Sequence, residues 1–175
     1  MRVGLLGGSF NPAHEGHAHV AETAMARLGL NKVLWLVSPQ NPLKESGETA
    51  PLAERMAGAR AVATRPGMVV TDIEADLGSP YTIDTIRWLK RRYPAVRFVW
   101  LMGSDNLESL HFWRDWRSIV REVEVAVVPR PPSTVRGRLA PGGRLLAASE
   151  RARVLDAPLN GASSTAIRER AKGGS

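Results

Sequence analysis

The chain of 175 residues contains no cysteine, and this absence excludes disulfide bonds and catalysis by a thiol. It also has no apolar run that approaches the length of a membrane-spanning helix. Its N-terminus lacks a basic stretch followed by a long apolar one, so the sequence indicates no signal peptide. We therefore expect a cytoplasmic protein that does not associate with membranes.

Internal repeats and low-complexity tracts are also missing, which favours a single domain over residues 1–175. This length is sufficient for a sizeable core. The hydrophobic content of 43% is ordinary for a globular protein. The sequence leaves open whether the chain forms a homo-oligomer.

Basic residues outnumber acidic ones, 24 to 17, which gives a net charge of +7. Such a charge suits either nucleic acid or a small polyanionic molecule. The basic residues are spread along the chain, and aromatic side chains are not interleaved with them as a base-stacking surface would require. We therefore expect a polyanionic small molecule as partner and no nucleic acid.

Short apolar segments alternate with amphipathic ones, which predicts an α/β fold with a Rossmann-like, doubly wound and mainly parallel sheet and helices on both faces. We expect strands at residues 2–6, 32–37, 68–73, 96–102 and 123–128, with weaker candidates at 144–148 and 153–156. We expect helices at residues 16–28, 51–64, 82–92 and 164–171, and one further helix that holds Leu107, Leu110, Trp113, Trp116 and Ile119. Residues 133–143, rich in proline, glycine and arginine, are expected to form an exposed loop.

The most informative segment directly follows the first expected strand. Gly7 and Gly8 allow the backbone to turn and to approach a ligand closely. His14 and His17 then lie at the start of the first helix, whose unpaired N–H groups and dipole favour an anion. Two imidazoles at that point add directed donors, so the segment predicts a site for phosphate transfer.

Zinc binding by His14, His17 and His19 is an alternative interpretation of the same segment. Zinc sites usually recruit cysteine or a carboxylate at a recognisable spacing, and this chain has no cysteine. We therefore expect no metal held by these histidines. His19 is expected to be a packed or surface residue of the helix.

Further polar residues follow the later strands and begin the last helix. Asp105 comes after the glycine turn that ends the fourth strand, and it either meets a ribose hydroxyl or caps the next helix. Arg130 follows the fifth strand and either lies near adenine or phosphate or belongs to a loop that the neighbouring prolines shape. The hydroxyls of residues 163–165 either cap the final helix or help its N-terminus to hold a triphosphate, with Arg168 as a forked donor.

The segments GGSFNPAHEGH and SSTAIR together resemble the two signatures of the nucleotidyltransferases that carry an H-x-G-H motif and a Ser/Thr-rich C-terminal motif. Three further segments are similar to the bacterial nicotinate-nucleotide adenylyltransferases: MGSDNLESLHFWRDW, SPYTIDTI, and NPLK followed by Arg55. The resemblance covers nearly the whole chain.

This resemblance implies an enzyme of NAD biosynthesis that joins ATP to nicotinate mononucleotide and releases pyrophosphate and nicotinate adenine dinucleotide. It implies His14, His17 and Arg168 as catalytic residues, and Mg²⁺ that is bound with ATP or pyrophosphate rather than at a fixed protein site. The residues that it places at ATP and its phosphates are Gly7, Gly8, Ser9, Phe10, Gly16, Lys44, Gly103, Asp105, Arg130, Ser163, Ser164 and Thr165.

The resemblance also implies contacts to the nicotinate nucleotide by Thr82, Thr85 and Trp113. Trp113 would stack on the pyridine ring, and backbone N–H groups near Thr82 and at residues 112–113 would meet the nicotinate carboxylate. The other interpretation of Trp113 is a core residue of its helix, as we expect for Trp116.

The chain departs from the family pattern at Leu43, where many relatives have a histidine, although Lys44 keeps the charge of that loop. One alternative function is a sibling enzyme whose acceptor is nicotinamide mononucleotide or phosphopantetheine. Trp113 argues against phosphopantetheine as the acceptor. The choice between the acid, nicotinate mononucleotide, and the amide, nicotinamide mononucleotide, depends on one hydrogen-bonding group. Another alternative is a non-catalytic module that binds nucleotide or RNA, which would not need both His14 and His17.

Overall fold

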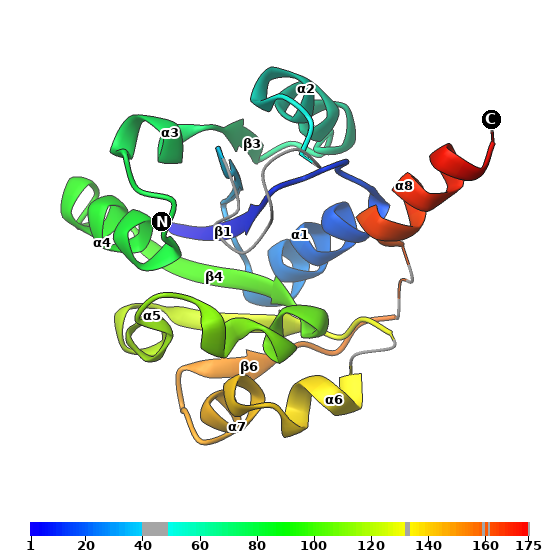
Figure 1. Cartoon of the computed structure of the whole chain (residues 1–175). Helices are drawn as coiled ribbons and strands as arrows, with labels where there is room; N and C mark the ends of the chain where they lie inside the picture. The colour runs from blue at the N-terminus through cyan, green and yellow to red at the C-terminus, as the bar shows by residue number, and fades with distance from the viewer. Residues whose placement is uncertain (40–48, 132–133, 159, 161, 175) are drawn as a thin grey trace.

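The computed structural model describes residues 1–39, 49–131, 134–158, 160 and 162–174 (Figure 1). Six strands form one sheet in the order β3-β2-β1-β4-β5-β6, and every neighbouring pair is parallel. The strands are β1 (Arg2–Gly8), β2 (Lys32–Val37), β3 (Met68–Thr71), β4 (Arg97–Gly103), β5 (Glu124–Val128) and β6 (Ala152–Val154). This order is that of the doubly wound Rossmann-like fold, which confirms the predicted fold class.

Helices follow the strands and cover both faces of the sheet (Figure 1). They are α1 (Glu15–Leu28), α2 (Leu52–Val62), α3 (Ile73–Leu77), α4 (Thr82–Arg92), α5 (Trp116–Glu122), α6 (Thr134–Leu139), α7 (Pro141–Ala147) and α8 (Ser164–Gly173), with the 3-10 helices η1 (Ser104–Glu108) and η2 (Leu110–Phe112). Among the described residues, no helix combines the length and the hydropathy that crossing a bilayer requires.

Two hydrophobic cores lie on the two faces of the sheet, because side chains alternate along each strand. On one face, Leu5 of β1 packs with residues of α4 such as Ile86. On the other, Leu6 packs with Ala21 and Ala24 of α1. Full burial of one such leucine or isoleucine contributes about 1.5–3 kcal/mol to the free energy of unfolding. The sheet is thereby fixed as a rigid base for the loops at its edge.

The strand order reverses between β1 and β4, and this reversal determines where a ligand can bind. Connections after β1 lead towards β2 and β3, whereas β5 and β6 lie on the other side of β4. The loops that follow β1 and β4 therefore diverge, and in sheets of this kind ligands bind between such loops at the carboxyl edge. Gly7 of β1 lies at this point. A Cβ there would be 2.5 Å from the ring of Trp100 on β4, so glycine leaves the room that this tryptophan needs.

The prediction of a single helix that holds the apolar residues of 107–119 is wrong. The chain forms η1 and η2 instead, and α5 begins only at Trp116. The apolar residues are spaced by three, whereas an α-helix has about 3.6 residues per turn, so such a row drifts around the helix by about 60° at each step. A spacing of three matches a 3-10 helix and buries Leu107 and Leu110. Asp115, at φ +48°, separates these elements from α5.

The predicted loop at 133–143 and the weak strand at 144–148 are also wrong, because the described residues there form α6 and α7. The glycines that suggested a loop lie at close packing contacts: Gly137 and Gly142 lie against η1 and η2, and Gly143 lies against α6. A Cβ on Gly143 would lie 2.0 Å from the carbonyl oxygen of Gly137. Only glycine therefore allows the two helix backbones to come this close, and the sequence pattern alone does not distinguish this use from a turn.

The third strand ends at Thr71 rather than at the predicted Ile73. The hydroxyl of Thr71 accepts the N–H of Ile73 at 3.3 Å, and this local bond begins α3, which the sequence analysis did not predict. The predicted bounds of the strand at 32–37 and of the helix at 82–92 are confirmed. The weak candidate at 153–156 appears as β6, which begins one residue earlier and ends two residues earlier than predicted.

Candidate functional site

His14 and His17 form the first turn of α1 through their own side chains. His14 is the N-cap in extended conformation, and its Nδ1 accepts the N–H of Gly16 at 3.0 Å. The Nδ1 of His17 accepts the N–H of His14 at 3.1 Å. Because each Nδ1 is an acceptor, each neutral imidazole carries its proton on Nε2. The turn therefore offers two Nε2–H donors from rings whose centroids are 3.9 Å apart.

Burial keeps both imidazoles neutral at physiological pH. Desolvation, with a smaller contribution from the charge of Arg130, lowers the pKa of His14 to about 4, against a small opposing effect of Asp105. Desolvation also lowers the pKa of His17 to about 3, assisted by the neighbouring His14 and by Arg130. The charged groups that act on these imidazoles are Arg130, which follows β5, and, for His14, also Asp105 of η1, which follows β4.

Gly16 is required because the chain passes close to it on two sides. A Cβ at this position would lie 2.8 Å from both Cε1 and Nδ1 of His14. It would also lie 3.0 Å from the carbonyl oxygen of Ala162, in the segment that leads into α8. The missing side chain of Gly16 therefore lets the C-terminal segment and the His14 ring share the start of α1, whereas its predicted phosphate contact stays a prediction.

Phe10 supports His17 from behind. Its backbone has φ +48°, a conformation that costs a non-glycine residue about 1–3 kcal/mol. Its buried ring meets His17 edge-on at 4.8 Å and stacks on Trp35 at 5.3 Å. The side chain of Phe10 therefore positions the imidazole of His17. The predicted phosphate contact of Phe10 would come from its backbone.

Arg130 lies across the end of β4 and is 8% exposed. Its backbone N–H donates to Oγ of Ser104 at 2.7 Å, and that hydroxyl donates to the carbonyl oxygen of Arg130 at 3.0 Å. Its Nη2 donates to the carbonyl oxygen of Ala162. A Cβ on Gly103 would lie 2.6 Å from Cδ of Arg130, so glycine at the strand end makes room for the arginine.

Asp105 belongs to η1 and pairs through Oδ2 with Nη1 of Arg130 at 3.5 Å. Its Oδ1 is buried and has no hydrogen-bond partner in the part of the chain that the structure describes. The N-cap of η1 is Gly103, and no side chain caps this helix, so the capping interpretation of Asp105 is wrong. A buried carboxylate oxygen without a donor is costly, and the predicted contact with a ribose hydroxyl would satisfy it.

The C-terminal motif lies against the N-terminal one, although about 150 residues separate them. Nη1 of Arg168 donates to the carbonyl oxygen of Asn11, and its Nη2 lies 3.4 Å from Oγ1 of Thr165. Figure 1 shows α8 beside the start of α1. Oγ of Ser163 accepts the N–H of Ala166 at 3.1 Å, so Ser163 caps α8. Two predicted phosphate contacts, those of the Ser164 side chain and of Lys44, lie outside the described residues.

Arg55 on α2 is a positioning residue, whereas in the sequence it stands out only through the resemblance to the family. Its guanidinium is buried and donates to four carbonyl oxygens, those of Ser9, Ser38, Pro39 and Ala50. It thereby fixes Ser9, at the end of β1, relative to the loop after β2. The only signal in the sequence is an arginine on the buried side of a helix.

The residues predicted at the nicotinate nucleotide lie on two neighbouring elements. Thr82 is the first residue of α4, and Trp113 lies in the turn after η2, half-buried and edge-on to Trp100 at 6.1 Å. Thr85 is fully buried, and its hydroxyl donates to Oε1 of Glu74 at 3.2 Å. The side chain of Thr85 therefore braces α4 against α3, and the predicted contact of this residue would have to come from elsewhere on the helix.

Glu74 was not singled out by the sequence, because a lone glutamate on a five-residue helix carries no signal. Burial raises the pKa of its carboxyl to about 7, against the opposing effect of hydrogen bonds from Thr85 and Ser38. The pKa of this carboxyl, which lies beside the start of α4, is therefore close to neutral pH.

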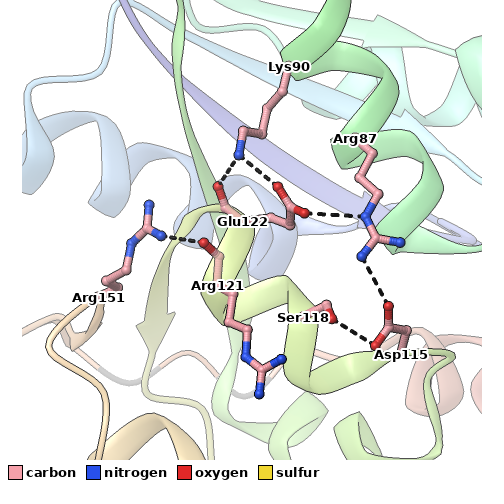
Figure 2. Close-up of polar contacts among 7 residues, drawn as sticks. All are labelled: Arg87, Lys90, Asp115, Ser118, Arg121, Glu122 and Arg151. Carbon is pink, nitrogen blue, oxygen red and sulfur yellow. Dashed lines mark hydrogen bonds and ion pairs between the residues drawn. The ribbon is translucent and has the colours of Figure 1, made fainter.

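A surface network of charges holds α4 against α5 (Figure 2). Arg87 contacts Asp115 at 3.1 Å and Glu122 at 3.3 Å, and Lys90 contacts Glu122 at 2.8 Å. Asp115 also accepts the hydroxyl of Ser118 at 2.8 Å. Each exposed pair contributes little to the free energy of unfolding. Together, however, they fix the turn that carries Trp113 relative to α4.

Comparison with known proteins identifies the family to which this chain belongs. The model of the cytidylyltransferase-like family matches residues 5–170. A protein of Caulobacter sp. (strain K31) named "Probable nicotinate-nucleotide adenylyltransferase" is 59% identical over 97% of this chain and 98% of its own length. A protein of the same name from Parvibaculum lavamentivorans is 48% identical over 97% and 92%.

Among solved structures, Plasmodium falciparum nicotinic acid mononucleotide adenylyltransferase complexed with NaAD shares the fold, with a TM-score of 0.79 at 16% identity. The match covers 96% of this chain and 82% of that one. On the curated relatives and the family match, this chain belongs to the cytidylyltransferase-like family and, within it, to the nicotinate-nucleotide adenylyltransferases.

Proposed function

We propose that this chain transfers the adenylyl group of ATP to the phosphate of nicotinate mononucleotide, forming nicotinate adenine dinucleotide and releasing pyrophosphate. Relatives that align over nearly the whole chain carry the name of this activity. The observation that carries the proposal is the meeting of Ala162 with both Gly16 and Arg130, together with the bond from Arg168 to Asn11. These contacts bring both sequence motifs together at the start of α1, beside the guanidinium groups of Arg130 and Arg168.

The reaction needs no general base. The nucleophile is a phosphate monoester whose second pKa is about 6, so it is mostly a dianion at neutral pH. One of its oxygens forms a bond to the α-phosphorus of ATP. The bond from that phosphorus to the oxygen that bridges to the β-phosphate breaks, and its electron pair leaves with pyrophosphate. The protein has to align two polyanions and stabilise the charge that develops between them.

His14 and His17 supply directed donors for this task. Their Nε2–H groups are fixed by the hydrogen bonds of Nδ1, and the start of α1 adds its own N–H groups and dipole. Arg130 and Arg168 provide permanent positive charge for the departing pyrophosphate. Removal of one donor of this kind typically costs about 10²–10³ in kcat.

Mg²⁺ would enter this reaction as part of the substrate, bound to the phosphates of ATP. Within the described residues, no group of three or more His, Asp and Glu side chains could hold a metal ion. Both Nδ1 atoms of the paired histidines are already occupied by backbone N–H groups. We propose that the metal arrives with the nucleotide and has no fixed protein ligand.

The acceptor would lie between the turn of Trp113 and the first turn of α4. Trp113 offers a flat ring for stacking on the pyridine, and the N-terminal N–H groups of α4 near Thr82 suit a carboxylate. The ribose of one nucleotide would satisfy the buried Oδ1 of Asp105.

The test is release of pyrophosphate from ATP with each of three acceptors: nicotinate mononucleotide, nicotinamide mononucleotide and phosphopantetheine. We expect fast release with the first, slower release with the second and none with the third. Equal rates with the first two acceptors would refute the specificity, and no turnover with any acceptor would refute the enzyme. Binding of RNA with a steep salt dependence, without turnover, would favour a non-catalytic module instead.

A further inference from the structure

Arg114 lies directly after Trp113, and its guanidinium carbon is 4.6 Å from the centroid of the Tyr81 ring. Tyr81 is the N-cap of α4 and directly precedes Thr82. The cation therefore spans the two segments between which the proposed function places the pyridine ring. Three successive residues of the turn are each fastened to another part of the fold: Trp113 to Trp100, Arg114 to Tyr81, and Asp115 to Arg87.

The acidic side chains in the two segments that Arg114 connects are engaged by other groups. Asp115 accepts the hydroxyl of Ser118 and pairs with Arg87. Asp84, in the first turn of α4, accepts the hydroxyl of Ser79 at 2.8 Å. In the described ranges, the guanidinium of Arg114 has the Tyr81 ring as its partner and contacts no carboxylate. Its N–H donors thus remain available at an exposed position.

We infer that Arg114 determines the specificity for the acid, by directing its guanidinium to the carboxylate of nicotinate mononucleotide. This inference rests on the proposed function. A guanidinium presents only donors, so it attracts a carboxylate strongly. The amide of nicotinamide mononucleotide carries no charge, and its NH₂ group would oppose one donor with another. The face of Tyr81 holds the guanidinium in place without neutralising it.

The test compares Arg114→Gln with the native enzyme for both acceptors. Arg117→Gln is a matched control, because Arg117 is also exposed and its guanidinium carbon lies 4.5 Å from the centroid of the Trp116 ring. We expect kcat/KM for the acid to fall about tenfold in Arg114→Gln, mainly through KM, as for loss of one charge-assisted hydrogen bond. We expect less than a twofold change for the amide. Arg117→Gln should change neither, and Arg114→Lys should keep most of the preference.

Two other results would overturn the inference. An equal loss for both acceptors would mean that Arg114 only holds the turn in place, and no loss for the acid would mean that its charge is not used. Added salt supplies a second measurement: it should lower the acid preference of the native enzyme and leave that of Arg114→Gln unchanged. If the native enzyme does not turn over nicotinate mononucleotide at all, the proposed function fails, and that result is distinct from an effect of Arg114.

Discussion

His14 and His17 cap the first turn of α1 reciprocally: His14 accepts the N–H of Gly16, and His17 accepts the N–H of His14. In most proteins Ser or Thr together with Glu or Gln closes this arrangement. Here imidazoles take both places, so the hydrogen bonds that begin the helix also fix the tautomer and direction of two donors. Helix initiation and preorganisation of the site are one structural feature.

His14→Asn separates the two roles of this residue. Asparagine is a good N-cap, so we expect the free energy of unfolding to stay about 1 kcal/mol above that of His14→Ala. Asparagine cannot place a donor where Nε2–H lies, so kcat should fall about 10²–10³ in both variants. Steady-state release of pyrophosphate and urea unfolding measure the two effects. Retention of activity in His14→Asn would remove His14 from the mechanism.

Gly16→Ala should disable the site through crowding. The new Cβ would press on the His14 ring and on the carbonyl of Ala162, so we expect a fall in kcat of at least about tenfold and a lower free energy of unfolding. Gly58→Ala in α2 is the control, because a Cβ there meets nothing within 4 Å. The control should keep full activity and gain up to about 1 kcal/mol in stability. Equal behaviour of the two variants would contradict the close approach at Gly16.

The two histidines should make the protein sensitive to acid. Their pKa values of about 4 and 3 in the folded state lie below the ordinary 6.5 of an unfolded chain. Their contribution to stability is therefore complete above pH 6.5 and is lost as the pH falls through the folded values. The expected slope is about 1.4 kcal/mol per pH unit for each histidine. Urea unfolding at pH 6.5 and 4.5 should show a smaller difference for His14→Asn/His17→Asn than for the native chain.

Glu74 should have the opposite pH dependence. Its pKa rises from 4.5 to about 7 on folding, so burial of its charge lowers the free energy of unfolding as the pH rises from 4.5 through 7. Glu74→Gln keeps an acceptor for the hydroxyl of Thr85 and removes the charge. The variant should gain up to roughly 3 kcal/mol relative to the native chain between pH 5 and pH 8. A constant difference over this range, measured by urea unfolding, would show that Glu74 does not titrate as described.

The sequence by itself predicted the sheet and the two segments of the candidate site, the one with His14 and His17 and the one at residues 163–168. Short apolar runs such as residues 33–37 are typical of buried strands between two helical layers, and their alternation with helices favours a parallel sheet. The histidines after a glycine turn indicated a phosphate site, because a helix start favours anions whatever the rest of the fold. The positions of Lys44 and of the Ser164 side chain remain predictions.

Only the tertiary structure decided the elements and contacts that depend on distant residues. A row of apolar residues spaced by three fits either a poor α-helix or two 3-10 helices, and burial of Leu107 and Leu110 selected the latter. Gly143 lies in a contact between two helices, because the backbone of Gly137 lies against it. Ala162 on Gly16, and Arg114 over Tyr81, join segments far apart in the chain. Local sequence determines which conformations a segment can adopt, but which surfaces meet depends on how the whole chain excludes water.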